Sequence, residues 1–489
     1  MPSAKLDLEA INKKYVKGLE TVWPMPKHTI KMFYSETCPH CTPPYTVISG
    51  SYRSISEIRE RDSCLGISGH VKVLNTFKRP YRGKLVIIKT RGLLPLELTP
   101  EHPVLVVTGL PTNKRTEFTK PYWKPARDLI PKRAKKKGDY LLVPRVKGEI
   151  DIDKLSLQPY TTQRGVNDAE AKGYPTSFPL NYETAWLLGL YVAEGDATEK
   201  AVRFHLGKHE RKLVQRLCKT IQMLGYHPRV VENRTTTSVE LQSRILARAF
   251  KDWCGRTAEN KHIPQFVLYH KNVGVVKSFL KGYVDGDGYV KSNFVGISTV
   301  SRVLALQIQL LNARLGNIAK IYHYNYTGRY KHYIEGRRIN ARDIYKVEWF
   351  HSKYHRGAIL NNFIAYPVKD VEFIDYNGTV HNLETADETY LAFNAVVHNC
   401  KRVLPLLQEF ERQHPEVSVE IIEATTERQT KHLAAILGGK KPEVPTAVID
   451  GKYLVVGETN FIERISFALK LAEKTPPLQE EKSRWLLRT

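Results

Sequence analysis

The chain has 489 residues, with 75 Lys+Arg against 50 Asp+Glu, and a formal net charge of +25. A single hydrophobic core stops growing at about 250–300 residues, so the length excludes a one-domain protein and indicates about three domains. Wholesale disorder is also excluded, because 42% of the residues are hydrophobic and 26% are charged. No apolar run approaches the roughly 18–20 residues of a membrane helix, and no secretory signal opens the chain. We therefore expect a cytoplasmic protein with no membrane partner.

The positive charge is concentrated in the middle of the chain. Residues 1–40 carry 6 Lys+Arg and 4 Asp+Glu, and residues 400–489 carry 14 and 13. The two ends therefore account for +3 of the net charge, and residues 41–399 account for the other +22. A basic segment of this kind favours a polyanion such as DNA as a partner, although a solvated basic surface gives the same count.

Near the N-terminus, residues 28–34 predict a buried strand that leads into Cys38-Pro39-His40-Cys41. A CxxC after a strand is typical of a redox dithiol when an amphipathic helix follows it. Here Thr42-Pro43-Pro44 follows, and two prolines do not begin that helix. The helical pattern instead begins at Cys400, which lies 359 residues after Cys41, with apolar residues on one face as far as Phe410.

Joining His40 to Cys400 gives MFYSETCPHCKRVLPLLQEF, in which strand, dithiol and helix are contiguous. The rest of the C-terminal segment predicts a strand at 417–422, a helix at 427–437, a hairpin and a last helix, with these final elements at 447–450, 453–456 and 461–471. The joined sequence resembles the thioredoxin/glutaredoxin family, in which Pro405 would match the proline that kinks the helix and Pro445 the cis-proline that faces the dithiol.

That resemblance implies an α/β host of thioredoxin-like fold, built from residues 1–40 and 400–489. Cys38 would be its nucleophile and Cys400 its resolving thiol, and disulfide substrates or a reductase would be its partners. A lone CxxC is also half of a zinc site, but the sequence has no second cysteine pair to complete one.

The residues that bound the segment 41–399 have the chemistry that its removal needs. The thiol of Cys41 can attack the carbonyl of His40 and turn the amide into a thioester, and the thiol of Cys400 can take over the acyl group. Asn399 can then cyclise through its side-chain amide and cut the chain behind itself. Cys41, the pair His398-Asn399 and the following Cys400 together resemble the boundary of an intein.

An internal motif agrees with this resemblance. Thr99-Pro100-Glu101-His102 resembles the intein motif in which Thr99 would hold the scissile region and His102 would protonate the departing amide nitrogen, although T-x-x-H between strands is by itself more often a turn. The family implies an all-β, Hint-type splicing domain from about 41–150 and 366–399, which needs no cofactor. Many members have Asp where Asn382 stands and His where Glu388 stands, so Glu388 is the candidate group that activates Cys400.

The remaining residues, about 165–345, contain an internal repeat. The segments 187–195 and 280–288 both resemble the LAGLIDADG motif, and their final glycines are 288 − 195 = 93 residues apart. Each predicts an apolar helix with an acid in its last turn and a glycine that ends it. Small residues would let the two helices approach closely; these are Gly189, Ala193, Gly282 and Gly286. The alternative for both helices is plain core packing.

The LAGLIDADG resemblance implies an α+β domain with two αββα repeats, which would be a homing endonuclease for double-stranded DNA that carries the uninterrupted host-gene site. Glu194 and Asp287 would lie side by side and hold Mg²⁺. Lys261 would stabilise charge or organise the attacking water, and its alternative is a solvated surface lysine. Basic and aromatic residues at 329–338 would line the DNA-binding sheet.

Two further features leave alternatives open. The run Lys132-Arg-Ala-Lys-Lys-Lys137 predicts a solvated loop, or a supplementary DNA contact. A Cys38–Cys41 disulfide in the precursor would occupy the splicing nucleophile until it is reduced, or the overlap of the two motifs is incidental. The rival interpretations of the whole chain are a permanent redox protein with a DNA-binding insert, and a splicing intein whose nuclease is inactive.

Overall fold

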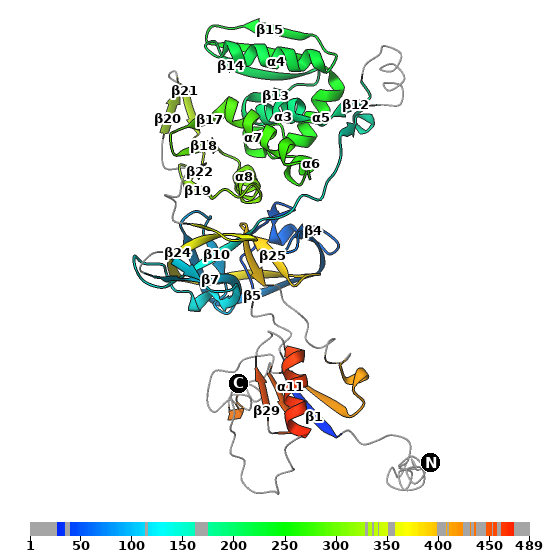
Figure 1. Ribbon diagram of the computed structural model, residues 1–489, viewed down its shortest axis with the longest axis vertical. Coiled ribbons are helices and arrows are strands. Elements are labelled where there is room, and N and C mark those ends of the chain that lie inside the picture. The colour runs from blue at the N-terminus through cyan, green and yellow to red at the C-terminus, as the bar shows by residue number, and fades with distance from the viewer. Residues whose placement is uncertain are drawn as a thin grey trace, which may run out of the picture. The chain divides into compact units, whose positions relative to one another are not determined.

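The computed structural model describes residues 27–34, 40–112, 116–161, 175–327, 331–334, 337–340, 342–350 and 357–398, together with 407, 410–423, 431, 435–436, 446–451, 453–456 and 461–473 of the C-terminal segment. The chain divides into two compact units (Figure 1). Unit 1 consists of Met1–Cys38 and Cys400–Thr489, and unit 2 is Pro39–Asn399. Each unit has its own hydrophobic core.

Unit 1 contains a four-stranded mixed sheet in the order β27-β1-β28-β29. Strand β1 lies between its neighbours, parallel to β27 and antiparallel to β28. The elements are β1 (His28–Tyr34), β27 (Val417–Glu423), β28 (Thr446–Ile449), β29 (Tyr453–Val456) and helix α11 (Phe461–Glu473). The predicted strands and last helix are therefore present, while Pro405, Pro445 and most of the helices expected at 400–410 and 427–437 lie outside the described residues.

The first and last strands of unit 2 together form a large antiparallel sheet. Between them in sequence lies the nuclease-like part, from β11 (Lys154–Ser156) to β22 (Ile344–Phe350). The main path of the large sheet runs β3-β2-β25-β26-β7-β10-β24-β5-β4, and within the described residues four shorter strands pair with β5, β7 and β24. The bounds are β2 (Val47–Ile48), β3 (Arg53–Ser54), β4 (Ser63–Leu65), β5 (His70–Thr90), β6 (Leu96–Leu98), β7 (Pro103–Pro111), β8 (Thr116–Phe118), β9 (Tyr122–Pro125), β10 (Gly138–Pro144), β23 (Ala358–Ile359), β24 (Phe363–Thr385), β25 (Thr389–Ala392) and β26 (Ala395–His398).

Two long strands of this sheet, β5 and β24, are neighbours. They pair antiparallel from Thr90 opposite Val368 to Val73 opposite Thr385, with two register shifts. β26 pairs with β7 through Val397 and Val104, so the last strand of the unit lies next to the segment that contains the T-x-x-H motif. The Lys132–Lys137 run lies in a loop before β10, and its residues 133–137 are exposed, which fits both interpretations of its sequence.

The nuclease-like part of unit 2 consists of two halves, each with its own four-stranded antiparallel sheet. A short strand pair, β11 (Lys154–Ser156) with β12 (Ser177–Pro179), precedes them. The first half contains α3 (Tyr182–Glu194), β13 (Gly195–Ala197), β14 (Ala201–Gly207), α4 (Arg211–Met223), β15 (Pro228–Glu232), β16 (Thr236–Gln242) and α5 (Arg244–Cys254). The second contains α7 (Val273–Asp287), β17 (Gly288–Val290), β18 (Phe294–Thr299), α8 (Arg302–Arg314), β19 (Ala319–Tyr324) and β22 (Ile344–Phe350), with α6 (Gln265–Leu268) before it and β20 (Lys331–Ile334) paired to β21 (Arg337–Asn340) as a separate ribbon.

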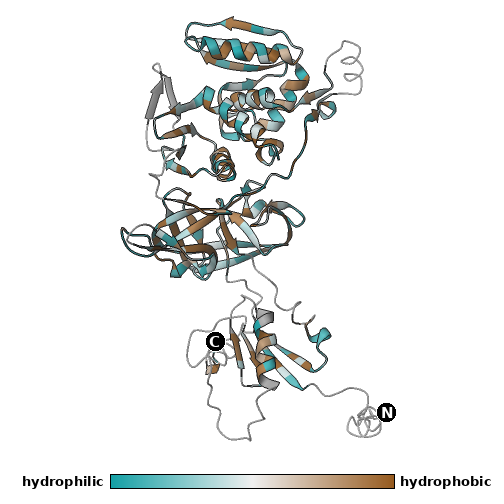
Figure 2. Ribbon diagram, in the orientation of Figure 1, coloured by the Kyte–Doolittle hydropathy of each residue, from teal (hydrophilic) through white to brown (hydrophobic). Residues whose placement is uncertain are grey.

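The repeat is longer than the αββα unit expected from the sequence. Two more strands follow the second helix of each half and complete the sheet, as β15 and β16 do in the first half. In the second half β22 runs to Phe350, past the expected boundary at residue 345, because it pairs with both β18 and β19. In Figure 2 hydrophobic and hydrophilic residues alternate along α4, whose buried side comprises Leu217, Thr220 and Ile221.

The two repeat helices, α3 and α7, pack directly against each other, as the small residues predict. A Cβ on Gly189 would lie 2.0 Å from the carbonyl oxygen of Phe279, and one on Gly282 would lie 2.0 Å from that of Trp186. Gly286 faces Ala193 in the same way, at 2.7 Å from its Cβ. Only glycine at these positions allows the backbones to approach this closely.

The two glycines end their helices, as the sequence predicts, and they do so in extended backbone. Gly195 and Gly288 have φ values of −95° and −92°, which are extended and not left-handed. Each begins a strand directly, and a Cβ there would lie 2.7 Å from Cα of Tyr191 or 2.6 Å from Cα of Val284. These glycines are therefore required by close packing against the preceding helical turn, and not by a left-handed cap.

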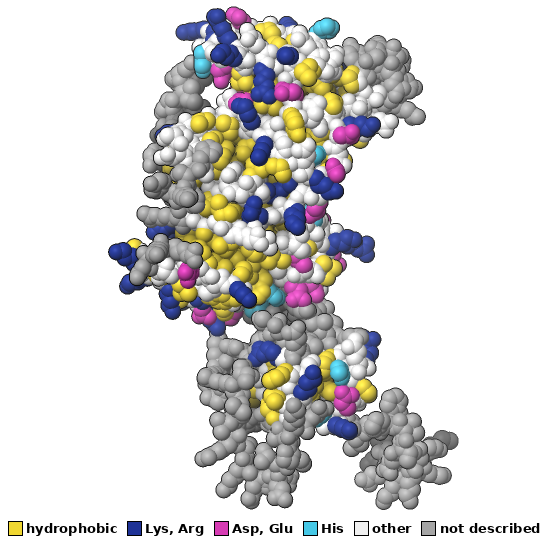
Figure 3. Space-filling model, in the orientation of Figure 1, with side chains coloured by type: hydrophobic (Ala, Val, Ile, Leu, Met, Phe, Trp, Pro, Cys, Tyr) yellow, Lys and Arg dark blue, Asp and Glu magenta, His cyan; other side chains and the backbone are white. Residues whose placement is uncertain are grey.

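One continuous hydrophobic core runs through unit 2, from strands of the large sheet to both nuclease-like halves. Lys and Arg side chains are spread over the face of unit 2 that Figure 3 shows, in line with the charge of this segment. Within the described residues, no helix has the length and apolar character that a membrane span requires.

Candidate active sites

The N-terminal boundary residue Cys41 is held in the large sheet by hydrogen bonds to Thr99. The backbone N–H of Cys41 donates to Thr99 Oγ1 at 2.9 Å, and the N–H of Thr99 donates to the Cys41 carbonyl oxygen at 2.9 Å. Both residues are buried. Thr99 therefore fixes both backbone polar groups of Cys41, including the nitrogen of the bond between His40 and Cys41.

The ring of His102 lies between the two ends of the segment 41–399. Its Nδ1 is 3.2 Å from the carbonyl oxygen of Cys41, and its Nε2 is 3.1 Å from the carbonyl oxygen of His398. These contacts join residues that are 357 positions apart in the sequence. Of the sequence-predicted splicing residues, the structure thus brings Cys41, Thr99, His102 and His398 together, while Asn399 and Cys400 lie outside the described residues.

Burial controls the charge of His102. The ring is fully buried, and desolvation together with the neighbouring ring of His40 lowers its pKa to about 3, against the opposing effect of the Cys41 carbonyl. At neutral pH the ring is uncharged and carries one N–H. Because both facing atoms are carbonyl oxygens, which only accept, the neutral ring can donate to one end of the segment at a time.

Arg79 is a site residue that the sequence reasoning missed. Thr42 bridges His381 of β24, and the preceding residue of β24, Val380, pairs with Arg79 of β5. Since side chains alternate along a strand, Arg79 lies on the sheet face that carries Cys41. Its guanidinium hydrogen-bonds to the Cys41 thiol and also lies 5.0 Å from the ring of Tyr81.

This contact opposes the effect of burial on the nucleophile. Burial raises the pKa of the Cys41 thiol above its ordinary value, and the charge and hydrogen bond of Arg79 lower it. A thiolate is the reactive form of cysteine, so Arg79 favours the form that can attack a carbonyl. No sequence signal separates Arg79 from its basic neighbours Lys78, Arg82 and Lys84.

Aromatic and amide side chains surround His102 and His398. The ring of Tyr390 packs edge-on against His102 with centroids 6.4 Å apart, and its hydroxyl donates to Asn382 Oδ1 at 2.8 Å. Trp123 packs edge-on against His398 at 4.9 Å. Glu388 lies in the turn before β25 with a φ of +62°, and the residue that it was expected to activate, Cys400, is outside the described residues.

The second candidate site lies where α3 and α7 end. Burial and the negative charge of Asp287 raise the pKa of Glu194 to about 7, and desolvation raises that of Asp287 to about 6. The two carboxyls therefore interact, and both charges are disfavoured where they stand.

A divalent cation fits these two carboxyls. Within the described residues no three His, Cys, Asp or Glu side chains gather as a complete protein metal site. Mg²⁺, however, usually takes one or two carboxylates and completes its shell with water and substrate phosphates. A cation here would also offset the burial that raises both pKa values and the charge of Asp287 that adds to the rise at Glu194.

Lys261 is buried at 5% exposure, which excludes the solvated surface lysine as its interpretation. Its Nζ donates to the carbonyl oxygen of Tyr191 at 2.7 Å and lies 3.4 Å from the centre of the Tyr191 ring. Burial lowers its pKa to about 8. Lys261 is thereby tied to the last turn of α3 through Tyr191, which lies three residues before Glu194.

The remaining predicted site residues, Cys38, Cys400 and Pro445, lie outside the described residues. Of the segment 329–338, the structure describes the backbone of residues 331–334 and 337–338.

Comparison with known proteins identifies one part of the chain. Residues 274–348 match the family described as LAGLIDADG-like domain. This range begins in α7 and ends in β22, so it covers the second half of the nuclease-like part. The chain therefore contains a LAGLIDADG-like domain beside a large antiparallel sheet.

Relatives of the chain include the ATP-dependent DNA helicase Hel308 of Thermococcus kodakarensis, which is 29% identical over 397 residues that cover 73% of this chain and 35% of the helicase. An iron-sulfur cluster assembly SufBD family protein of Mycobacterium tuberculosis is 25% identical, with 75% of this chain and 43% of that protein covered. The chain thus spans well under half the length of these relatives. Among solved structures, I-DmoI in complex with DNA and Mn matches with 16% identity and a TM-score of 0.27, over 34% of this chain and 89% of that one.

Proposed function

We propose that residues 41–399 are an intein, which excises itself and joins His40 to Cys400. The observation that carries the proposal is the position of His102, whose ring contacts the carbonyl oxygens of Cys41 and His398 at once. Excision requires both ends of a segment to meet in one reaction centre, and a single buried imidazole between them meets that requirement.

The relatives support a segment that is inserted in different host proteins. The helicase and the iron-sulfur assembly protein have unrelated names, yet each matches about three quarters of this chain. The proposed intein has 359 residues, which is 73% of the 489 in the chain. A segment of one size that recurs in longer, functionally unrelated proteins is expected of an insertion that removes itself.

The first step follows from the groups around Cys41. The Cys41 thiol gives its proton to the neutral His102 ring, and its sulfur attacks the carbonyl carbon of His40. The bond from that carbon to the Cys41 nitrogen breaks, and the nitrogen, which Thr99 holds through its N–H, takes the proton back from His102. Arg79 stabilises the thiolate before the attack.

In the later steps the Cys400 thiol takes over the acyl group, and Asn399 cyclises with cleavage of the bond to Cys400. His102 Nε2 lies at the His398 carbonyl, where it can polarise the peptide bond that precedes Asn399. The freed amine of Cys400 then attacks the thioester, which leaves an ordinary peptide bond from His40 to Cys400.

For the LAGLIDADG-like domain we propose a homing endonuclease that acts on double-stranded DNA containing the uninterrupted host-gene site. Glu194 and Asp287 would hold Mg²⁺, which when bound polarises a phosphodiester and lowers the pKa of water. Lys261 is tied to the same helix end and would bear a proton or orient water there. The alternative is a nuclease that binds DNA without cutting it.

For the joined host we propose a cytoplasmic thiol-disulfide oxidoreductase of thioredoxin-like fold. Its support is the sheet of unit 1. In that sheet β1, which precedes the junction in sequence, lies between β27 and β28, which follow the junction; β1 is parallel to β27 and antiparallel to β28. Cys38 would attack a disulfide substrate, Cys400 would resolve the mixed disulfide, and Pro445 would face them.

Expression of the full chain, followed by intact-mass measurement, tests the proposal. Splicing yields a 130-residue host (489 − 359) and a 359-residue intein, and a Cys41→Ala/Asn399→Ala variant keeps the full mass. If the folded, reduced parent also keeps only the full mass, the chain is a permanent redox protein with an insert. Cleavage of DNA that encodes the joined host, with Mg²⁺ and with Glu194→Gln and Asp287→Asn as controls, separates an active from an inactive nuclease.

A further inference from the structure

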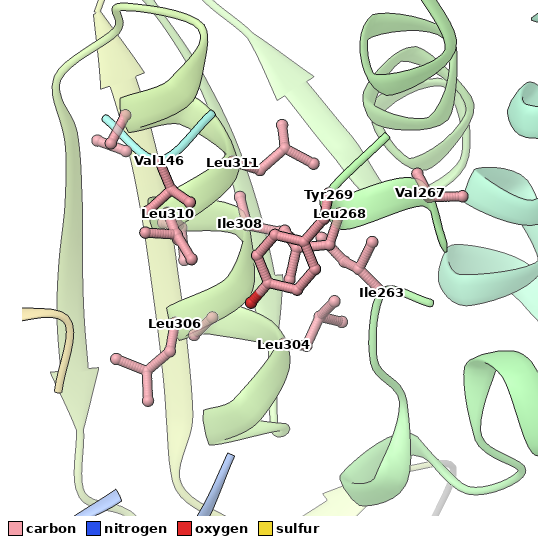
Figure 4. Packing of buried hydrophobic residues seen from close by; sticks show 14 of the residues in the cluster. Val146, Ile263, Val267, Leu268, Tyr269, Leu304, Leu306, Ile308, Leu310 and Leu311 are labelled. Atoms are coloured by element: carbon pink, nitrogen blue, oxygen red, sulfur yellow. The ribbon is translucent and has the colours of Figure 1, made fainter. Parts of the chain in front are cut away.

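Helix α8 of the LAGLIDADG-like domain is buried all around, although it contains three amide side chains. Every residue from Leu304 to Ala313 is buried, including Gln307, Gln309 and Asn312. The helix packs against β18, β19 and β22 of its own domain and against β10 of the large sheet. Figure 4 shows Leu306 and Leu310 on one side of the helix, and Leu304, Ile308 and Leu311 on the side of Tyr269. The helix therefore belongs to the cores of both parts.

Gln309 is the residue through which this helix reaches the large sheet. Its Nε2 donates to the carbonyl oxygen of Gly92 at 2.8 Å, as well as to that of Ala319 in its own domain at 3.0 Å. Its Oε1 accepts from Asn394 Nδ2 at 3.1 Å. The same Asn394 nitrogen donates to the carbonyl oxygen of Leu306 at 2.9 Å, so both hydrogens of this amide go to α8.

Asn394 occupies the turn between β25 and β26, four residues before His398. Phe393 and Asn394 both have positive φ, of 47° and 70°, which fixes a tight reversal. On its other side Asn394 Oδ1 accepts from Ser49 Oγ at 2.8 Å, and the N–H of Ser49 donates to the Leu391 carbonyl at 2.9 Å. Asn394 is fully buried, so these partners replace water completely.

A buried amide needs its partners, because leaving one unsatisfied is unfavourable. For Asn394 both hydrogen-bond acceptors come from the LAGLIDADG-like domain. We propose that α8 is a working part of the splicing domain, with Gln309 as a positioning residue that holds the β25–β26 turn and thereby sets His398 against His102. This inference rests on the proposed splicing function.

The chain offers a matched control two residues away on the same helix. Gln307 is of the same type and is also buried, but it bonds Ile263 of its own domain, through the Ile263 N–H at 2.6 Å and its carbonyl at 3.2 Å. Gln309→Leu and Gln307→Leu therefore remove equivalent amides, and only the first removes a bond to the large sheet.

The two splicing steps are measured separately. In a Cys41→Ala background, release of residues 400–489 reports Asn399 cyclisation alone. In an Asn399→Ala background, thiol-induced release of residues 1–40 reports thioester formation alone. We expect Gln309→Leu to slow the release of 400–489 about tenfold, which corresponds to one lost buried hydrogen bond, and the thioester step by less than about threefold. Gln307→Leu leaves both rates within about twofold of the parent.

A second substitution keeps the test valid if Gln309→Leu impairs folding. Asn394→Gly suits the positive φ and removes the amide from the other side, so it should give the same selective loss. The double variant should lose no more than either single one, because both remove one interaction. Parent-like cyclisation in both single variants, or an equal slowing of both steps in Asn394→Gly, would overturn the inference. A parent that does not splice at all would instead overturn the proposed function.

Discussion

Replacement of Arg79 by methionine should shift the pH at which thioester formation begins. The guanidinium hydrogen-bonds to the Cys41 thiol and lowers a pKa that burial raises. Methionine has a similar stem and no charge, so Arg79→Met leaves burial as the dominant influence. The thiol pKa then rises, and the rate at a fixed neutral pH falls because less thiolate is present.

The size of the effect follows from two opposing terms. An opposite charge within about 4–6 Å moves a pKa by about 1–3 units, so its removal lowers the thiolate fraction about 10- to 1000-fold below the pKa. A more basic thiolate is also a stronger nucleophile, and a Brønsted coefficient of about 0.5 returns half of that loss on a logarithmic scale. The net expectation is a rate about 3- to 30-fold lower at pH 7, with the pH–rate curve displaced to higher pH.

The assay is thiol-induced release of residues 1–40 across a pH series, in an Asn399→Ala background. Arg79→Lys keeps a cation and should displace the curve less. Arg82→Met is the matched control, because Arg82 lies on the same strand and is exposed. If Arg79→Met leaves the rate unchanged, or lowers the rate without moving the pH at which it reaches its plateau, Arg79 does not stabilise the thiolate.

Three other predictions concern the fold and the second site. Gly282→Ala places a Cβ 2.0 Å from the Trp186 carbonyl and should destabilise the α3–α7 pair by about 1–3 kcal/mol, seen as a lower urea midpoint for that domain. Asp139→Ala leaves Lys124 without its buried partner, 2.8 Å away, and also frees the Ile130 N–H, so urea unfolding of the large sheet should lose about 3–5 kcal/mol. The pKa values of Glu194 and Asp287 are raised by folding, to about 7 and about 6, so their contribution to stability is complete below about pH 4 and is lost as the pH rises through these values. A melting temperature that falls between pH 4 and pH 8, recovers with Mg²⁺ and becomes flat in Glu194→Gln/Asp287→Asn checks this; a flat profile in the parent contradicts it.

The sequence was most informative where residue type and spacing are distinctive together. The two glycine-rich repeats predicted the close helix pair because only small residues permit it, and the distances at Gly189 and Gly282 confirm that reason. The strand at 28–34 and its partners after residue 400 were predictable from the apolar residues of these segments. The segment 41–399 between them has prolines near its start instead of the helix that the dithiol motif requires.

Contacts between distant residues of common type could not be predicted. Arg79 stands among other basic residues of one strand, and only the register of β5 with β24 turns it toward Cys41. Gln309 and Gln307 are equivalent in sequence, yet one bonds across to the large sheet and the other does not. The extra strands of each repeat were missed because the motif defines the helix and not the length of the sheet that covers it.

The new peptide bond is the most direct evidence for the central claim. After reduction, trypsin cuts the joined host at Lys31 and Lys401 and releases MFYSETCPHCK, which contains His40 bonded to Cys400. The unspliced chain instead yields MFYSETCPHCTPPYTVISGSYR, in which His40 is still bonded to Cys41. Fragmentation spectra of the first peptide from the parent, and of the second alone from Cys41→Ala/Asn399→Ala with alanine at its tenth position, are the predicted result. Detection of only the second peptide from folded, reduced parent would contradict splicing.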